Sequence, residues 1–181
     1  RQYEILDAMA PGGVVFVANQ WPVFDDSGRM IDLQEDDPGK PSQYPDFDSY
    51  RAAMGEAIAS IAARGQTIVI VGAKPELGYD VADCFGRPLR PAARDCSVLL
   101  SDFTQDASRT NRLLSSIADE HDNVWFFDLA QPFCREGDCS YLTNERLPLL
   151  RDDNGHFSEI GSELVGRSII AWANEQRVPI P

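Results

Sequence analysis

Three runs of mostly apolar residues stand out along the chain, separated by stretches in which apolar residues recur every three or four positions. The runs lie at residues 14–18, 67–71 and 123–128. A strand whose side chains are apolar on both faces is buried on both faces. Each run therefore predicts a strand inside a sheet that is covered on either side.

The stretches around these runs predict helices. Asp46 or Asp48 can cap the start of the second helix, and Gly65 can close its end. The third helix should turn Leu113, Leu114 and Ile117 inward. The four expected helices cover approximately residues 2–9, 46–65, 104–120 and 158–174.

Strands that alternate with helices predict an α/β fold. With 181 residues, the chain should form one domain, a three-layer α/β/α sandwich with a mostly parallel sheet. Functional sites in such sheets gather at the carboxyl ends of the strands. Asn19, the loop after Val71 and the loop after Asp128 should therefore lie on one edge, where a site is expected.

Two segments predict long loops. Residues 25–44 are acidic and rich in Pro, Gly and Ser, which indicates a surface loop. This loop is either a solvated segment without a task or a lid over a site, and the sequence leaves both open. Residues 72–102 form the second predicted loop.

The charge and hydropathy of the chain narrow its possible partners. The formal net charge is -13 at pH 7, which argues against a nucleic acid or an anionic membrane surface as partner, because either needs a basic face. The longest apolar run, near residues 68–71, has the length of a strand and not of a membrane span.

The four cysteines form two local pairs in the sequence, Cys84 with Cys96 and Cys134 with Cys139. The chain has no C-x-x-C pattern, so a structural zinc site is weakly supported. Both pairs lie in Pro- or Gly-bearing loops, which suits two disulfides in an oxidising compartment, the periplasm or the cell exterior. Four free thiols in a cytosolic protein remain the alternative.

An acid and a histidine lie close together before the last predicted helix. Asp153 precedes His156 by three residues, and Asp152 competes with Asp153 for the same role. A carboxylate on one ring nitrogen fixes the tautomer of an imidazole that acts as a base. The alternative is an exposed Asp-rich turn whose histidine caps the helix. His121, the other histidine, is interpreted as a solvated surface residue.

This order of elements resembles the SGNH (GDSL-type) hydrolase family, whose fold is flavodoxin-like. It most resembles the SGNH domains fused to membrane-embedded sugar O-acyltransferases of bacteria. Four features carry the resemblance. They are the strand at 14–21 that ends in a tryptophan, the strand at 67–75 that ends in a proline, the cysteine pair 134–139, and the block 153–161, which is similar to D-x-x-H-L-S-x-x-G.

The resemblance implies roles for four residues. Asp153 and His156 would be the acid and the base of a Ser-His-Asp triad, with His156 taking the serine proton and returning it to the leaving group. Asn19 lies near the position of an oxyanion-hole asparagine, and Trp21 would pack beside the site. A turn residue at the end of the strand is the alternative for Asn19.

The chain departs from the family at the nucleophile. No Gly-Asp-Ser occurs in it, and Asp26-Ser27-Gly28 lies in the acidic loop without a buried strand before it. Because Arg1 opens directly into a predicted helix, we expect the first strand and the nucleophile to lie upstream of this residue or on another chain.

The resemblance implies an extracytoplasmic domain that passes an acyl group, such as acetyl, from a serine to a cell-surface polysaccharide such as lipopolysaccharide. A membrane acyltransferase domain would deliver the acyl group and tether the domain to the bacterial inner membrane. A secreted carbohydrate acetylesterase and a non-catalytic carbohydrate-binding module are the alternatives. None needs a metal or an organic cofactor, and the acidic surface favours a neutral or cationic sugar.

Overall fold

The structure is a computed structural model of the chain, and its described residues fall into two compact units. The first unit comprises Arg1–Ala73, Asp106–Asp128 and Ala173–Pro181, and the second comprises Lys74–Gln105 and Leu129–Trp172. The residues that the structure describes are 12–19, 21–24, 28, 30–31, 46–75, 81–84, 96–104, 107–151 and 156–180. The helix predicted at residues 2–9 lies outside them.

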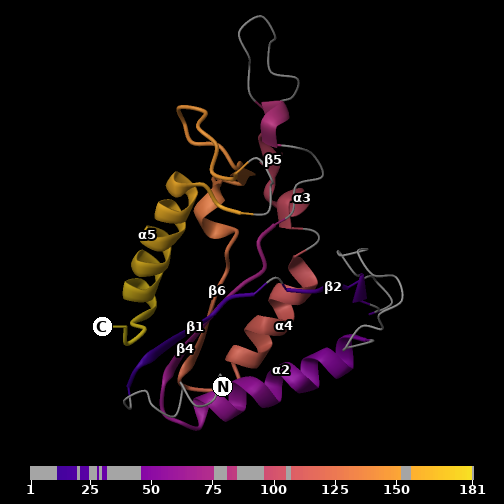
Figure 1. Cartoon of the computed structure of the whole chain (residues 1–181), viewed down its shortest axis with the longest axis vertical. Helices are drawn as coiled ribbons and strands as arrows, with labels where there is room; N and C mark the ends of the chain where they lie inside the picture. Colours follow the sequence, from indigo (N-terminus) through magenta and orange to yellow (C-terminus); the bar gives the residue numbers. More distant parts are fainter. Residues whose placement is uncertain are drawn as a thin grey trace, which may run out of the picture. The chain divides into compact units, whose positions relative to one another are not determined.

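A parallel sheet of three strands forms the centre of the first unit (Figure 1). Its strands, in the spatial order β1-β4-β6, are β1 (Val14–Val17), β4 (Thr67–Val71) and β6 (Val124–Phe127). Val17 is in register with Ile70, and Val71 with Phe127. All five residues of β4 are buried, so both faces of this strand are covered. The α/β fold with a parallel sheet predicted from the apolar runs is confirmed.

Two helices of the first unit pack with this sheet, α2 (Phe47–Ala62) and α4 (Ser108–Ala118). Asp46 caps α2, as predicted, by accepting a hydrogen bond of 2.8 Å from the Ser49 amide. This bond is the main reason why the pKa of Asp46 lies below its ordinary value. Gly65 has a φ of 75°, which suits the left-handed turn that follows the helix.

The core of the first unit lies between these helices and one face of the sheet. Ile68 and Ile70 project from β4 into a cluster with Leu113, Leu114 and Ile117 of α4. The inward face predicted for the third helix is therefore correct. The helix begins at Ser108, later than predicted, because residues Leu100–Thr104 form a separate short helix, α3.

A short hairpin precedes α2. β2 (Val23–Phe24) pairs in antiparallel fashion with β3 (Met30–Ile31), which falls inside the predicted loop 25–44. The Thr110 hydroxyl donates to the carbonyl of Pro22 over 2.7 Å, which ties the start of the hairpin to α4. Residues 32–44 lie outside the described part of the chain, so the proposal that this loop is a lid stays a prediction.

The second unit is built around a small antiparallel sheet of two-residue strands. The strands are β5 (Val98–Leu99), β7 (Cys134–Arg135) and β8 (Asp138–Cys139), in the order β5-β8-β7. Two short 3-10 helices, η1 (Val81–Cys84) and η2 (Gln131–Phe133), belong to the same unit. Disulfides join Cys84 to Cys96 and Cys134 to Cys139, the two pairings favoured by the sequence.

The last helix, α5 (Glu159–Gln176), begins where the sequence predicts it. Within the described ranges, no helix combines the length and the hydropathy that a membrane span requires.

Candidate functional site

The carboxyl ends of β1, β4 and β6 meet at one edge of the sheet, as predicted. Asn19 follows β1 and is exposed, Gly72 follows β4, and Asp128 follows β6. The Gly72 amide donates to the carbonyl of Phe127 over 2.8 Å and extends the pairing of β4 with β6 beyond the strand. This edge of the first unit therefore brings together the ends of three different segments.

Trp21 is a packing residue of this edge. It is only 5% exposed and belongs to the core cluster of the first unit. Its indole Nε1 donates to the carbonyl of Val71 over 2.8 Å, at the last residue of β4. The ring therefore ties the segment after β1 to the end of β4, and its one hydrogen-bond donor serves this contact.

Asn111 of α4 supports the same edge, although no pattern in the sequence marks this residue. Its side-chain oxygen accepts a hydrogen bond of 2.7 Å from the Ala73 amide. A Cβ atom at Gly72 would lie 2.9 Å from the same oxygen and 2.9 Å from the ring of Phe126. A larger residue at 72 would therefore push aside the Asn111 amide or the Phe126 ring, whereas glycine lets the strand end approach α4 this closely.

His156 lies in the second unit, at the end of a short two-stranded segment. Leu150 and Phe157 form an antiparallel bridge, and the Arg151 amide donates to the His156 carbonyl over 2.8 Å. The histidine itself is exposed. The His156 carbonyl and the residue that follows it are thus held by the backbone of residues 150–151, while His156 itself is exposed, which suits an imidazole that must reach a substrate. Asp152 and Asp153 lie outside the described residues.

Ser158 and Gly161 hold the start of α5 against the strand that precedes His156. The Ser158 hydroxyl accepts from the Gly161 amide over 3.1 Å, as an N-cap residue does, and donates to the Pro148 carbonyl over 2.8 Å. The Ser158 amide donates to the Leu149 carbonyl over 2.9 Å. A Cβ atom at Gly161 would lie 2.0 Å from that same Leu149 oxygen. The serine and glycine of the block that contains His156 are therefore positioning residues.

Aromatic rings anchor the other side of the His156 segment. Phe157 stacks on Phe133, with ring centroids 5.5 Å apart and an interplanar angle of 19°. Phe133 in turn contacts Tyr141 at 4.6 Å, and the Tyr141 hydroxyl donates to the Pro75 carbonyl over 2.6 Å. Phe157, the residue next to His156, is thus linked through Phe133 and Tyr141 to the segment that contains Pro75.

The predicted site residues are divided between the two units. Asn19 and Trp21 belong to the first unit, and His156 belongs to the second. His121 is partly exposed in the first unit, between α4 and β6. Among the residues that the structure describes, no three histidine, cysteine or acidic side chains gather as metal ligands would.

Comparison with known proteins identifies the family of the chain. A family model described as "SGNH domain (fused to AT3 domains)" matches residues 1–171. No curated protein and no solved structure gives a significant match. AT3 domains are acyltransferase domains, so the match places the chain in a class of hydrolase-like and acyltransferase-like enzymes. It also covers nearly all of the chain, including the β1, β4 and His156 segments, and the chain therefore belongs to the family of SGNH domains that are fused to AT3 domains.

Proposed function

We propose that this domain transfers an acyl group, such as acetyl, to a hydroxyl group of a cell-surface polysaccharide on the extracytoplasmic side of a bacterial membrane. An AT3 domain in the membrane would deliver the acyl group. A serine outside residues 1–181 would accept it, with His156 as the general base and Asp153 as the acid that orients the imidazole. The two disulfides suit an oxidising compartment.

The observation that carries this proposal is the way the backbone of His156 is held. The Leu150–Phe157 bridge and the Arg151 amide fix the histidine at the surface directly before α5. A general base must reach the proton that it abstracts, so a fixed backbone with an exposed imidazole suits the role.

The chemistry runs in two steps that use the same histidine. His156 would take the proton of the serine hydroxyl as the serine oxygen attacks the donor carbonyl, and it would return this proton to the leaving group. A sugar hydroxyl would then attack the acyl-serine and give its proton to His156, which returns it to the serine. The side-chain amide of Asn19 is the proposed hydrogen-bond donor to the carbonyl oxygen, on which negative charge develops in each step.

Two other functions use the same fold. A secreted acetylesterase would run the same steps with water in place of the sugar hydroxyl. A carbohydrate-binding module without catalysis would need no serine, and His156 would then have no chemical role. Family membership favours an enzyme over such a module, and the fusion with AT3 domains favours transfer over hydrolysis.

The test compares the two histidines in the intact protein that carries this chain. His156→Ala should slow acetyl release from p-nitrophenyl acetate by about a hundredfold or more, because it removes the general base. It should also abolish labelling by a fluorophosphonate probe, and mass spectrometry of the labelled wild-type peptide should identify a serine in a Gly-Asp-Ser sequence.

His121→Ala is the matched control, since His121 is the other histidine of the chain and lies in the turn before β6. It should leave both readouts unchanged. Equal activity in the His156 variant and the wild type would overturn the proposal and favour the binding module. Release of acetate without any transfer to a glycan would favour the esterase.

A further inference from the structure

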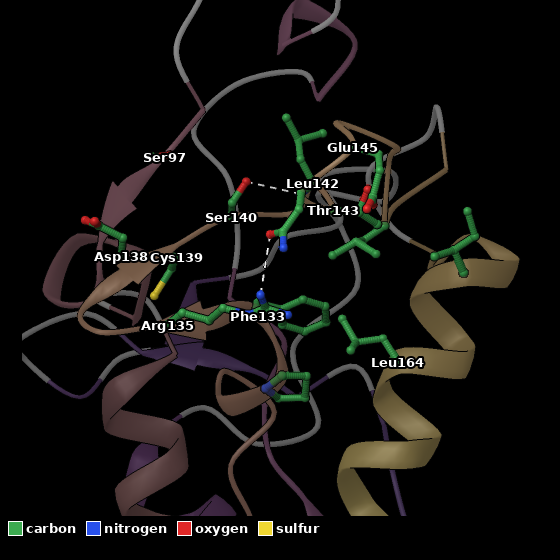
Figure 2. Close-up of a pocket in the computed structure, with 14 residues that line it drawn as sticks. Ser97, Phe133, Arg135, Asp138, Cys139, Ser140, Leu142, Thr143, Glu145 and Leu164 are labelled. Carbon is green, nitrogen blue, oxygen red and sulfur yellow. Dashed lines mark hydrogen bonds between the residues drawn. The ribbon is translucent and has the colours of Figure 1, made fainter.

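The second unit contains a cavity, and His156 is not among the described residues that line it (Figure 2). Its volume is about 540 Å³, within the range of small-molecule sites in proteins. The disulfide hairpin β7–β8, the loop at residues 142–145 and the first turns of α5 form its walls. All of these segments belong to the second unit, so the cavity is a feature of this unit alone.

The base of the cavity is apolar and fixed. Phe133 is 5% exposed and Leu149 is 2% exposed, and both line the cavity. Phe133 is packed between Tyr141 and Phe157, so it cannot swing away to admit a bulky apolar group. Leu164 and Ile160 of α5 extend this apolar surface toward the opening, where Ile160 is 41% exposed.

Other residues that line the cavity are polar and include both hydrogen-bond donors and acceptors. Arg135 donates to the side-chain oxygen of Asn144 over 3.4 Å, and both residues line the cavity. Asp138 and Glu145 add two carboxylates. Hydroxyl groups of Ser97, Ser140 and Thr143 complete the polar lining. A ligand of this cavity therefore meets planar amide, guanidinium and carboxylate groups above an apolar base.

The combination of apolar and polar side chains in this cavity favours some classes of ligand over others. An acyl chain or other wholly apolar ligand would remove water from the carboxylates and from Arg135. It would not replace the hydrogen bonds that this water makes, so binding would carry a large cost in free energy. Among the described residues that line the cavity, Asp138 and Glu145 bring two negative charges and Arg135 brings one positive charge, so an anionic ligand meets net repulsion there. A neutral sugar ring has apolar C–H faces and hydroxyl groups that both donate and accept, so it satisfies both parts of the surface.

We propose that this cavity binds a neutral pyranose unit of a glycan. The inference rests on the proposed function, since it names the binding place of the polysaccharide acceptor. Phe157 connects the cavity with the segment that carries His156. It follows His156 directly, and its ring stacks on Phe133 at the base of the cavity. A glycan held in the cavity is thus bound beside the segment that carries the general base.

The test measures binding with hydrogen–deuterium exchange of the intact protein. The probes are maltopentaose, cellopentaose and tetra-N-acetylchitotetraose, three neutral oligosaccharides, with trigalacturonic acid as the anionic comparison. At least one neutral probe should protect the amides of residues 134–147, and trigalacturonic acid should bind about tenfold more weakly or worse.

A pair of asparagine variants localises the binding. Asn144→Trp places a large ring at the opening of the cavity and should weaken binding of the active probe by about tenfold or more. Asn174→Trp, at an exposed position near the end of α5 that is not among the residues lining the cavity, should leave it unchanged. Both positions are exposed, so neither change should disturb folding.

The outcomes separate this inference from the proposed function. His156→Ala should lose acyl transfer and keep glycan binding, because His156 does not line the cavity. If all neutral probes leave residues 134–147 unprotected, or if Asn144→Trp binds as the wild type does, the cavity is not the glycan site, even where His156→Ala is inactive. If glycan binds there but His156→Ala keeps full transfer, the inference holds and the triad proposal fails.

Discussion

At the scale of single residues, the block 153–161 contains a candidate catalytic residue and two residues that hold the backbone around it in place. His156 is the candidate base, whereas Ser158 and Gly161 fix the helix start that follows it. The spacing of an acid and a histidine can be seen in the sequence. The reason for the glycine cannot, because it depends on the carbonyl of Leu149, which approaches only in the folded chain.

Two glycines of α5 provide a matched test of this role. Gly161→Ala should lower the free energy of unfolding by about 1–3 kcal/mol, because its Cβ would collide with the Leu149 carbonyl. Gly166→Ala should instead raise it by about 0.5–1 kcal/mol, because its new Cβ has no atom within 4 Å apart from the adjoining residues and backbone of its own helix, and alanine favours the helix. Urea unfolding followed by circular dichroism measures both. Equal effects of the two changes would contradict the proposed close contact.

The cap of α2 predicts a pH dependence. The pKa of Asp46 is lowered below 3.8 in the folded protein, chiefly by the hydrogen bond from the Ser49 amide. The ionised cap therefore stabilises the fold above the ordinary pKa, and this contribution is lost as the pH falls through the lowered pKa. Asp46→Asn keeps a neutral acceptor. Thermal unfolding should show a lower Tm for Asp46→Asn than for the wild type at pH 7, and this gap should close in acid. A gap that does not change with pH would exclude the charge as its cause.

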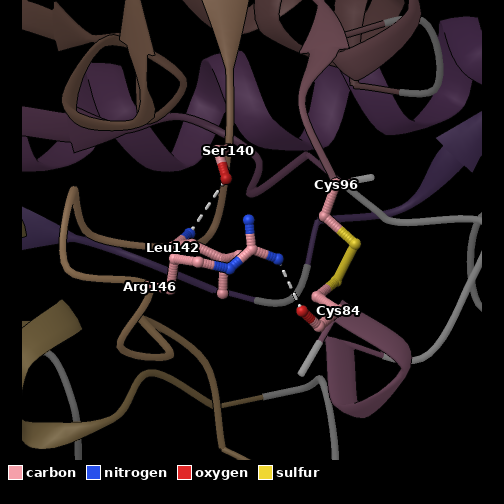
Figure 3. The surroundings of a disulfide bond; sticks show 5 residues. All are labelled: Cys84, Cys96, Ser140, Leu142 and Arg146. Atoms are coloured by element: carbon pink, nitrogen blue, oxygen red, sulfur yellow. Dashed lines mark hydrogen bonds between the residues drawn. A yellow bond between two sulfur atoms is a disulfide. The ribbon is translucent and has the colours of Figure 1, made fainter. Parts of the chain in front are cut away.

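At the scale of elements, the segment at residues 142–147 that borders the cavity is held by contacts across the second unit (Figure 3). Arg146 donates to the carbonyl of Cys84 over 2.8 Å, and the Cys84–Cys96 disulfide joins η1 to the segment before β5. The Leu142 amide donates to the Ser140 hydroxyl over 3.1 Å. The position of the segment at residues 142–147 therefore depends on the Cys84–Cys96 disulfide, which lies far from it in the sequence.

Removing the Arg146 contact should weaken glycan binding without unfolding the protein. Arg146 has a φ of 62°, a conformation that asparagine tolerates, so Arg146→Asn removes the guanidinium and keeps the backbone. The freed loop must then be ordered by the ligand, which should raise the Kd by about threefold to tenfold. Hydrogen–deuterium exchange should show faster exchange at residues 142–147 in the free variant. Arg112→Asn, on the exposed face of α4, is the control, and an unchanged Kd for Arg146→Asn would contradict the role of this contact.

The sequence predicts the elements of the first unit better than those of the second. The apolar run of β4 and the spacing of Leu113 and Ile117 in α4 are long enough to reveal their periods. β5, β7 and β8 have two residues each, so no period can appear in them. The contacts of Asn111 and Arg146 reach partners 38 and 62 residues away, and no local pattern indicates either one.

At the scale of the whole molecule, the net charge of -13 disfavours anionic ligands at long range, in addition to the local effect of the carboxylates in the cavity. A field of this sign repels anionic polymers before they reach any site. Salt screens such repulsion, because the Debye length falls from about 30 Å at 0.01 M to about 10 Å at 0.1 M ionic strength. The field of the whole chain and the two carboxylates of the cavity, Asp138 and Glu145, can therefore be separated by experiment.

Binding at two ionic strengths should distinguish these two sources of selectivity. A neutral oligosaccharide should bind with the same Kd at 0.01 M and 0.1 M salt, since it carries no charge. Trigalacturonic acid should bind more tightly at the higher salt if the whole field excludes it. If the carboxylates of the cavity exclude trigalacturonic acid, the double variant Asp138→Asn with Glu145→Gln should bind this probe more tightly than the wild type at both ionic strengths. Glu163→Gln combined with Glu175→Gln, two exposed carboxylates of α5 outside the cavity lining, is the charge-matched control. Tight binding of trigalacturonic acid to the wild type at low salt would contradict both mechanisms and assign the cavity to an acidic glycan.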